Sequence, residues 1–294
     1  MKKALLFLHI AVFLAGFTGV LGRLISLNES LLVWYRLLFT SVSMALLFLF
    51  QSAFPRISGR ELVRIFSVGA VVALHWVTFY GSIKYSNVSV ALVCFSTLGF
   101  FSALLEPAFT EKKLSFAEVG LGLMTVLGVY LIFHFDAQYK KGILFGLISA
   151  ALAALFTVLN KGLLKRHPSK TVTFYELTGG FVVLTCILPL YLHAFGQQFS
   201  LPQGWDWLWL LVLSWLCTVL AFYLALRALE KVSSFTVNLS YNLEPVYGIV
   251  LAFLLYKENE HLNRSFYAGL GLILFAVLIQ MGRVYRNRRS VVPV

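Results

Sequence analysis

The chain alternates between long apolar stretches and short polar connections along its whole length. A helix that crosses a bilayer needs roughly 20 consecutive apolar residues, and the sequence contains ten stretches of about that length. Backbone groups find no water in the hydrocarbon core, so such stretches must be helical. We therefore predict an all-α, polytopic membrane protein with ten transmembrane helices, near residues 4–22, 30–50, 65–84, 88–110, 114–135, 142–160, 171–193, 205–228, 233–256 and 265–283.

The composition supports this prediction. Of the 294 residues, 60% are hydrophobic and only 12% are charged, whereas a soluble domain carries about 25% charged residues. This excludes a water-soluble enzyme, a disordered chain and a disulfide scaffold. The cysteines Cys94, Cys186 and Cys217 lie inside apolar runs without metal-ligand spacing, and no phosphate-binding loop or nucleophile–base pair is present. We expect no enzymatic activity, cofactor or bound metal.

Basic residues set the expected orientation. Lys and Arg number 24 against 12 Asp and Glu, a net charge of +12. The excess lies in short flanks between apolar runs, which favours the cytoplasmic bias of membrane proteins over binding to nucleic acid. With the N-terminus inside, 17 basic residues fall on the cytoplasmic side and 6 on the other. We predict a multi-pass protein of the bacterial inner membrane with both termini cytoplasmic.

The two halves of the chain share a pattern. Phe79-Tyr80 and Phe222-Tyr223 each precede a short polar segment and an apolar run that ends in an acid, Glu111 or Glu258. Five spans in each unit is an odd number, so the second copy must be inverted in the membrane, as in alternating-access transporters. We predict a first repeat over 1–138, a second over 139–285, and a basic cytoplasmic tail over 286–294.

The segment Leu243–Glu258 resembles the ninth-span signature of the EamA-type drug/metabolite transporter superfamily, with an early Pro245 and a terminal Glu. Lys84-Tyr85-Ser86 and Glu111 resemble the matching features of the first EamA repeat. The resemblance covers essentially the whole chain. Members of this superfamily export amino acids, drugs or other metabolites, or import small solutes, so the resemblance implies transport and not a particular substrate. In span four the family often has a proline where this chain has Ser96–Gly99, so we expect the two halves to bend differently.

Ionisable residues inside the apolar runs are the candidate site, because a charge at the bilayer centre costs about 2.5–3.5 kcal/mol on insertion scales. Glu244 lies near the midplane, with His75 at similar depth. Glu244 is either a protonatable or cation-contacting group or a structural acid in an interhelical hydrogen bond. Pro245 frees the carbonyl of Tyr241 and permits a kink there.

The other candidates also have two interpretations. Arg36 either holds a substrate carboxylate or is structural, and His75 either relays protons or bonds across helices. Glu176 either binds a substrate amine or pairs with the Lys161/Lys165 cluster, while its depth argues against a direct salt bridge to Arg36 unless the spans tilt strongly. The predicted substrate-binding or proton-coupling residues are Arg36, His75, Trp76, Tyr80, Glu176, Tyr223, Ser240, Tyr241, Asn242 and Glu244.

The resulting hypothesis is a secondary-active carrier of small organic metabolites that works by alternating access. We predict export, driven by protons because the chain contains no nucleotide site. The alternatives are a non-transporting scaffold or receptor and, with less support from the scattered acids, a membrane-embedded lipid enzyme. The expected partners are a small-molecule substrate and the lipid bilayer, with a homodimer left open and no nucleic acid.

Overall fold

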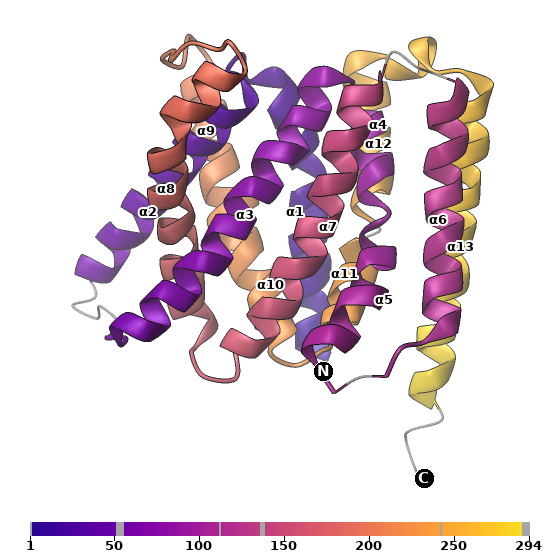
Figure 1. The fold of residues 1–294 in the computed structure, drawn as a ribbon, viewed down its shortest axis with the longest axis horizontal. Coiled ribbons are helices and arrows are strands. Elements are labelled where there is room, and N and C mark those ends of the chain that lie inside the picture. The colour runs from indigo at the N-terminus through magenta and orange to yellow at the C-terminus, as the bar shows by residue number, and fades with distance from the viewer. Residues whose placement is uncertain (1, 51–55, 112, 136–138, 242, 290–294) are drawn as a thin grey trace.

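The computed structural model describes residues 2–50, 56–111, 113–135, 139–241 and 243–289. These residues form helices joined by short connections, with no strand among them (Figure 1). The first half contains α1 (Lys2–Leu24), α2 (Glu29–Phe50), α3 (Gly59–Tyr85), α4 (Val88–Phe95), α5 (Leu98–Phe109) and α6 (Phe116–Phe135). The second contains α7 (Lys140–Leu163), α8 (Ser169–Ala194), α9 (Asp206–Ser214), η2 (Trp215–Leu220), α10 (Ala221–Leu229), α11 (Ser234–Tyr241), α12 (Glu244–Tyr256), η3 (Glu258–His261) and α13 (Arg264–Arg289).

The helices have the length and composition of membrane spans. Seven helical segments of the described chain are long and apolar enough to cross a bilayer, counting α4–α5 and α9–α10 as one segment each. Three shorter apolar helices, at Phe116–Ile132, Glu244–Tyr256 and Arg264–Ile279, fall in predicted spans five, nine and ten. The all-helical, polytopic class is confirmed, and the count of ten spans stays a prediction.

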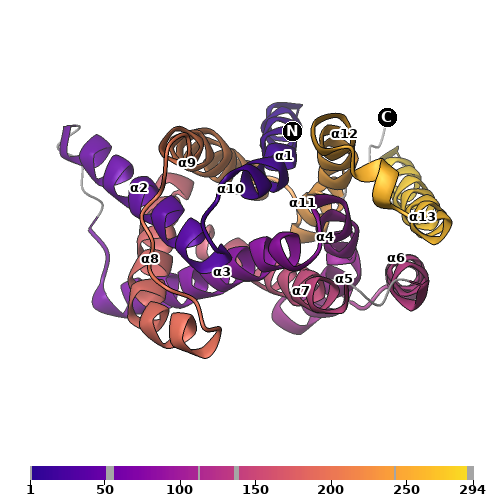
Figure 2. The same ribbon diagram turned by 90° about the horizontal axis from the view of Figure 1, so that it is seen from above.

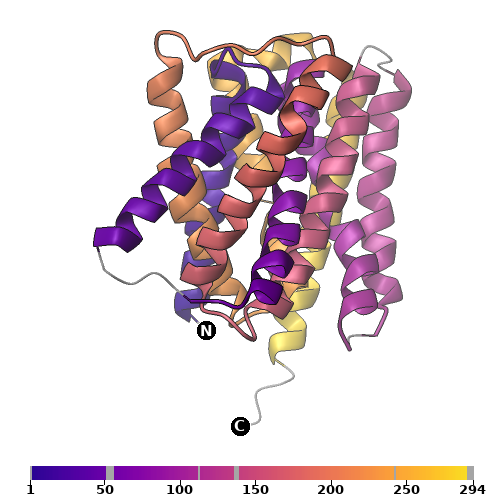
Figure 3. The same cartoon turned by 60° about the vertical axis from the view of Figure 1, so that its left-hand side comes forward.

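The helices run between two ends of one bundle. In Figures 1 and 3 the start of α1 and the end of α13 lie at the same end, which we call the terminal end. The opposite end carries the end of α1, the start of α4 and η3, and we call it the distal end. The first and last described helices therefore begin and end at the same end of the bundle, and the placement of the termini in the membrane stays a prediction.

The two halves of the chain interleave. Helix α3 packs against α7 and α8 of the second half, and α1 packs against α10 and α12. Helices α6 and α13 pair with each other at one edge of the bundle, as the view from above shows (Figure 2). The interface between the halves is therefore the centre of the molecule.

Glycines permit the closest of these contacts. A Cβ atom added to Gly69 of α3 would overlap the carbonyl oxygen of Glu176 and lie 2.8 Å from the backbone nitrogen of Gly180, both on α8. Helices in lipid associate through such small-residue contacts, since lipid tails are as apolar as leucine. The backbones of α3 and α8 therefore approach more closely than any side chain at Gly69 allows.

We expect Gly69→Ala to destabilise the protein by about 2 kcal/mol, because overpacking forces the two helices apart. Thermal unfolding in detergent should show a fall in Tm of about 4–8 °C. Gly120→Ala on α6 is the matched control, since its Cβ would meet no atom within 4 Å and alanine has the better helix propensity. Equal Tm values for the two variants would contradict the close contact.

Two predicted spans are interrupted at their centres. Helix α4 ends at Phe95 and α5 begins at Leu98, while α11 ends at Tyr241 and α12 begins at Glu244. The predicted kink next to Pro245 is confirmed. Each repeat breaks after an eight-residue half-helix, and the expectation that the two halves bend differently stays a prediction.

The two breaks have different chemical causes. In the first half, the hydroxyl groups of Ser96 and Thr97 donate to the carbonyls of Leu92 (3.2 Å) and Cys94 (2.7 Å), and such bonds compete with helical pairing. In the second half, Pro245 lacks the N–H that would bond to the preceding turn. The predicted span 205–228 is also not a uniform helix, since the π-helical turn η2 lies within it.

Candidate functional site

A cavity of about 90 Å³ lies where the two halves meet. One buried water needs roughly 10–15 Å³ of cavity volume, so the cavity has room for several water molecules. Its walls come from α1 to α5 in the first half and from α7, η2 and α10 to α12 in the second. The polar groups that line it include Arg36, His75, Asn160, Asn238, Tyr241 and Glu244.

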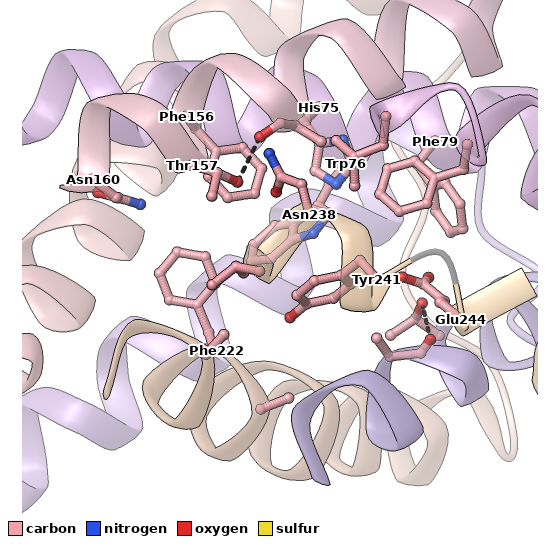
Figure 4. A pocket seen from close by; sticks show the side chains of 18 of the residues that line it. His75, Trp76, Phe79, Phe156, Thr157, Asn160, Phe222, Asn238, Tyr241 and Glu244 are labelled. Carbon is pink, nitrogen blue, oxygen red and sulfur yellow. Dashed lines mark hydrogen bonds between the residues drawn. The ribbon is translucent and has the colours of Figure 1, made fainter. Parts of the chain in front are cut away.

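Aromatic rings form much of the remaining wall. The ring of His75 lies 5.4 Å from that of Phe156 and 5.6 Å from that of Phe95, measured between centroids. Trp76 and Phe222 meet edge to face at 6.2 Å, across the interface between the halves. Figure 4 shows these labelled side chains of α3, α7 and α10 converging on the cavity. Ligand sites commonly combine such apolar walls with a few polar groups.

His75 holds α3 to α7. Its Nδ1 lies 2.9 Å from both the carbonyl oxygen and the hydroxyl of Ser149, and that hydroxyl also lies 3.2 Å from the carbonyl of His75. A carbonyl only accepts, so Nδ1 donates to the carbonyl of Ser149 and carries a proton. The predicted bond across helices is present, and His75 lines the cavity as well.

Arg36 is fully buried by polar and aromatic neighbours. Its Nε donates to the hydroxyl of Thr218 at 2.6 Å, one terminal nitrogen to the hydroxyl of Tyr80 at 2.8 Å, and the other to the carbonyl of Cys217 at 3.1 Å. The guanidinium also lies over the Trp76 ring, 3.8 Å from its centroid, in cation–π geometry. These contacts join α2 and α3 to η2, and hence the first half to the second.

Glu244 enters the cavity because of the break in span nine. It is the first residue of α12, is 4% exposed, and lines the cavity with Tyr241, the last residue of α11. Figure 4 shows both side chains at the cavity. The N-terminus of a helix favours negative charge through the helix dipole. The break therefore places a carboxyl group, with a favourable dipole, between the two repeats.

Glu176 lies behind the cavity wall. One of its oxygens accepts from the side-chain amide of Asn160 at 2.9 Å, and the other is buried without a hydrogen-bond partner among the described residues. Lys161 instead donates to the carbonyls of Leu229 and Val232. The predicted pairing of Glu176 with the lysine cluster is wrong, because Asn160 faces Glu176 from the adjacent helix. Arg36 and Glu176 have separate partners, as their depths indicated.

The remaining candidates are spread around the site. Tyr80 is fully buried and contacts Arg36, but it is not among the described residues that line the cavity. Tyr223 is half-buried and also absent from that lining, and the hydroxyl of Ser240 donates to the carbonyl of Thr236 at 2.9 Å within its own helix. Asn242 lies outside the described residues.

Asn160 was not among the predicted site residues. It lies at the end of an apolar run, directly before Lys161, where an amide is easily taken for a helix-end residue. The structure places it in the cavity with one amide oxygen that has no partner among the described residues. The only available signal was an uncharged polar residue within an apolar stretch, which is common in membrane helices.

A bundle of apolar helices in two halves, around a central cavity with aromatic walls and a few polar groups, is typical of membrane transporters. The sequence model of the EamA-like transporter family matches residues 2–134 and, a second time, residues 140–281. The chain therefore belongs to the EamA-like transporter family and is a multi-pass membrane transporter.

Relatives and a solved structure agree with this assignment. "Uncharacterized transporter YetK" of Bacillus subtilis is 30% identical over 232 residues, which span 74% of this chain and 68% of that protein. "Uncharacterized transporter YxxF" of the same organism is 27% identical over 66% of this chain, and the match spans 62% of its length. An uncharacterized transporter of Archaeoglobus fulgidus is 24% identical over 92% of this chain and 93% of its own. One crystal structure shares the fold, with a TM-score of 0.68 at 16% identity over 97% of this chain and 99% of that one.

Proposed function

We propose that this transporter is a proton-linked exporter of small organic metabolites that works by alternating access. The observation that carries the proposal is the cavity at the interface between the repeats, with the buried carboxyl group of Glu244 in its wall. An intramembrane acid is costly, so one that faces a cavity is a functional group by default. Alternative roles as a scaffold or a lipid enzyme leave such a cavity without a purpose.

The cavity extends towards the terminal end. Its lining includes Leu229, the last residue of α10, and Asn160, three residues before the end of α7. Towards the distal end it stops at Arg36 and Phe79, about 9–11 Å before the helix ends at 1.5 Å per residue. With the terminal end on the cytoplasmic side of the bacterial inner membrane, as the basic flanks favour, a substrate for export enters from the cytoplasm.

The lining favours a small, partly apolar substrate that carries a hydrogen-bond donor or a positive charge. Aromatic faces attract cations and flat groups, and the carboxyl group of Glu244 and the amide of Asn160 both offer acceptors. The guanidinium group of Arg36 is positively charged, whereas the acceptors of Glu244 and Asn160 attract positive groups. A cavity lined by both kinds of group suits a zwitterion. Amino acids and small amine-containing compounds meet these conditions.

Proton coupling is assigned to Glu244. A carboxyl group that alternates between a charged and a neutral form can bind either a proton or a cationic substrate, and exchange of one for the other links their movements. The gradient across a bacterial inner membrane drives protons inward. Exchange at one site then drives the substrate outward.

The test is counterflow and pH-driven flux with the purified protein in proteoliposomes. Candidate substrates come from a comparison of metabolites inside cells with and without the protein. We expect an imposed proton gradient to drive the accumulated metabolite against its concentration gradient. Flux that is saturable but insensitive to the proton gradient would support transport and contradict the proposal that protons drive it.

A further inference from the structure

The distal end is closed by one carboxylate from the second half. Glu258, in η3, forms an ion pair with Arg23 at the end of α1 and is 2% exposed. Its oxygens also accept from the backbone N–H groups of Val88 (3.1 Å) and Ser89 (2.9 Å) and from the Ser89 hydroxyl (2.6 Å). We call Arg23, Val88, Ser89 and Glu258 the distal latch, since it joins the two halves across the end of the cavity.

The distal latch uses the N-terminus of the half-helix α4. Asn87 caps this helix by accepting from the N–H of Val90 at 2.8 Å, which leaves the first N–H groups to Glu258. Charge-assisted bonds of this kind are stronger than neutral ones, and the helix dipole adds to them. Arg23 also lies 4.4 Å above the ring of Tyr256, so the latch holds the end of α12 against α1.

The second half repeats these features at the terminal end. Half-helix α11 has eight residues, as α4 does, and Ser233 caps it by accepting from the N–H of Thr236 at 3.1 Å. Glu111 follows the end of α5 by two residues, just as Glu258 follows the end of α12. Lys161 lies in the last turn of α7, just as Arg23 lies in the last turn of α1.

These terminal-end groups are separated in this conformation. Glu111 is exposed and borders a hollow of about 580 Å³ together with Lys161 and Lys165. The hydroxyl group of Ser234, in the first turn of α11, is fully buried and has no hydrogen-bond partner among the described residues. A buried hydroxyl without a partner is costly, which indicates a partner in another conformation.

We propose that Glu111 docks on the N-terminus of α11, beside Ser234 and Lys161, when the carrier faces the distal side, and so forms a terminal latch. Rocking of the halves closes the hollow at the terminal end and opens the distal latch. The conformation that faces the terminal side has the distal latch, and the one that faces the distal side has the terminal latch. Because each is stabilised by one buried carboxylate, neither is strongly favoured, as a cycling carrier requires. This inference rests on the alternating access of the proposed function and not on its substrate or coupling ion.

The test measures the two conformations directly. Nitroxide labels are placed on cysteines in proteoliposomes, and distances are measured by pulsed electron resonance without substrate or a proton gradient. Cys186, the exposed native thiol, is replaced by serine, since Cys94 and Cys217 are buried. All four label sites are exposed: the distal pair is Leu24 and Asn259, and the terminal pair is Gly162 and Leu114.

Substitution of Glu258 and substitution of Glu111 should shift the ratio of the two conformations in opposite directions. Glu258→Gln should raise the ratio of distal-open to distal-closed molecules about tenfold, and Glu111→Gln should lower it by about as much, since hydrogen bonds to a charged group are stronger than those to a neutral one. The double variant should return to the wild-type ratio. Ser89→Ala removes one bond of the distal latch and should give a smaller shift in the direction of Glu258→Gln.

Glu260→Gln is the matched control, because Glu260 is an exposed acid in the same short helix as Glu258, and it should leave the ratio unchanged. An unchanged ratio in Glu111→Gln, or a shift in the same direction as Glu258→Gln, overturns the terminal latch. Failure of proton-driven transport would leave these distances as they are. The two proposals therefore fail separately.

Discussion

Proton-driven transport should fall by about 100-fold in Glu244→Gln, equivalent to roughly 2.7 kcal/mol in the barrier. Glutamine keeps the shape of the side chain but neither binds nor releases a proton. The side chain lies in the cavity at the start of α12, and its replacement removes charge without opening a gap. The measurement is substrate uptake into proteoliposomes under an imposed pH gradient.

Two controls define what Glu244→Gln has changed. Counterflow, which moves no net protons, should persist in part, because the cavity and its aromatic walls remain. Tyr241→Phe removes a neighbouring hydroxyl from the same cavity wall and should retain the response to the pH gradient. Wild-type flux in Glu244→Gln would show that this acid is structural.

Arg36→Ala should destabilise the protein by about 3 kcal/mol, because it leaves buried groups of Thr218, Tyr80 and Cys217 without their donor. The expected fall in Tm is roughly 6–12 °C in detergent. Transport should also slow, since Arg36 forms the distal limit of the cavity and joins the two halves. Thermal unfolding and flux are measured on the same preparation.

Neighbouring variants separate the structural contribution of Arg36 from substrate binding. Tyr80→Phe removes one of its partners and should cost about 1 kcal/mol, without a change in cargo preference. Arg36→Lys retains the charge but not the planar fork. If Arg36 also holds a substrate carboxylate, the KM of carboxylate-bearing cargo rises more in Arg36→Ala than that of cargo without one. A wild-type Tm in Arg36→Ala would contradict the structural contacts.

Much of the functional site could be predicted from the free-energy cost of placing ionisable side chains in a membrane. Glu244 and His75 are expensive inside an apolar run, so their presence at midplane depth already predicted a cavity near them. Pro245 predicted the break that places Glu244 at a helix start. Trp76, Tyr241 and Arg36 were predicted for the same site, and they line the same cavity.

Other residues had no such signal. Asn160 is uncharged and its cost is small, so its position in the cavity could not be inferred from the chain. Glu176 and Tyr80 were predicted for the cavity but lie behind its wall, where they support Asn160 and Arg36. Depth along a helix can be counted from the sequence, whereas the direction that a side chain faces around the helix axis cannot. Lipid and protein interior are both apolar, so the hydrophobic pattern does not distinguish them.

The sequence by itself determined that this protein is a bundle of membrane helices in two similar halves, because a bilayer permits no other structure for such long apolar runs. The tertiary structure decided which helices interleave, that span four breaks without a proline, and which polar groups share one cavity. It also brought Glu258 onto the N-terminus of α4, 169 residues away from Ser89 along the chain. These outcomes depend on the packing of helices that are distant along the chain. Close contacts such as that at Gly69 determine this packing, and composition does not encode it.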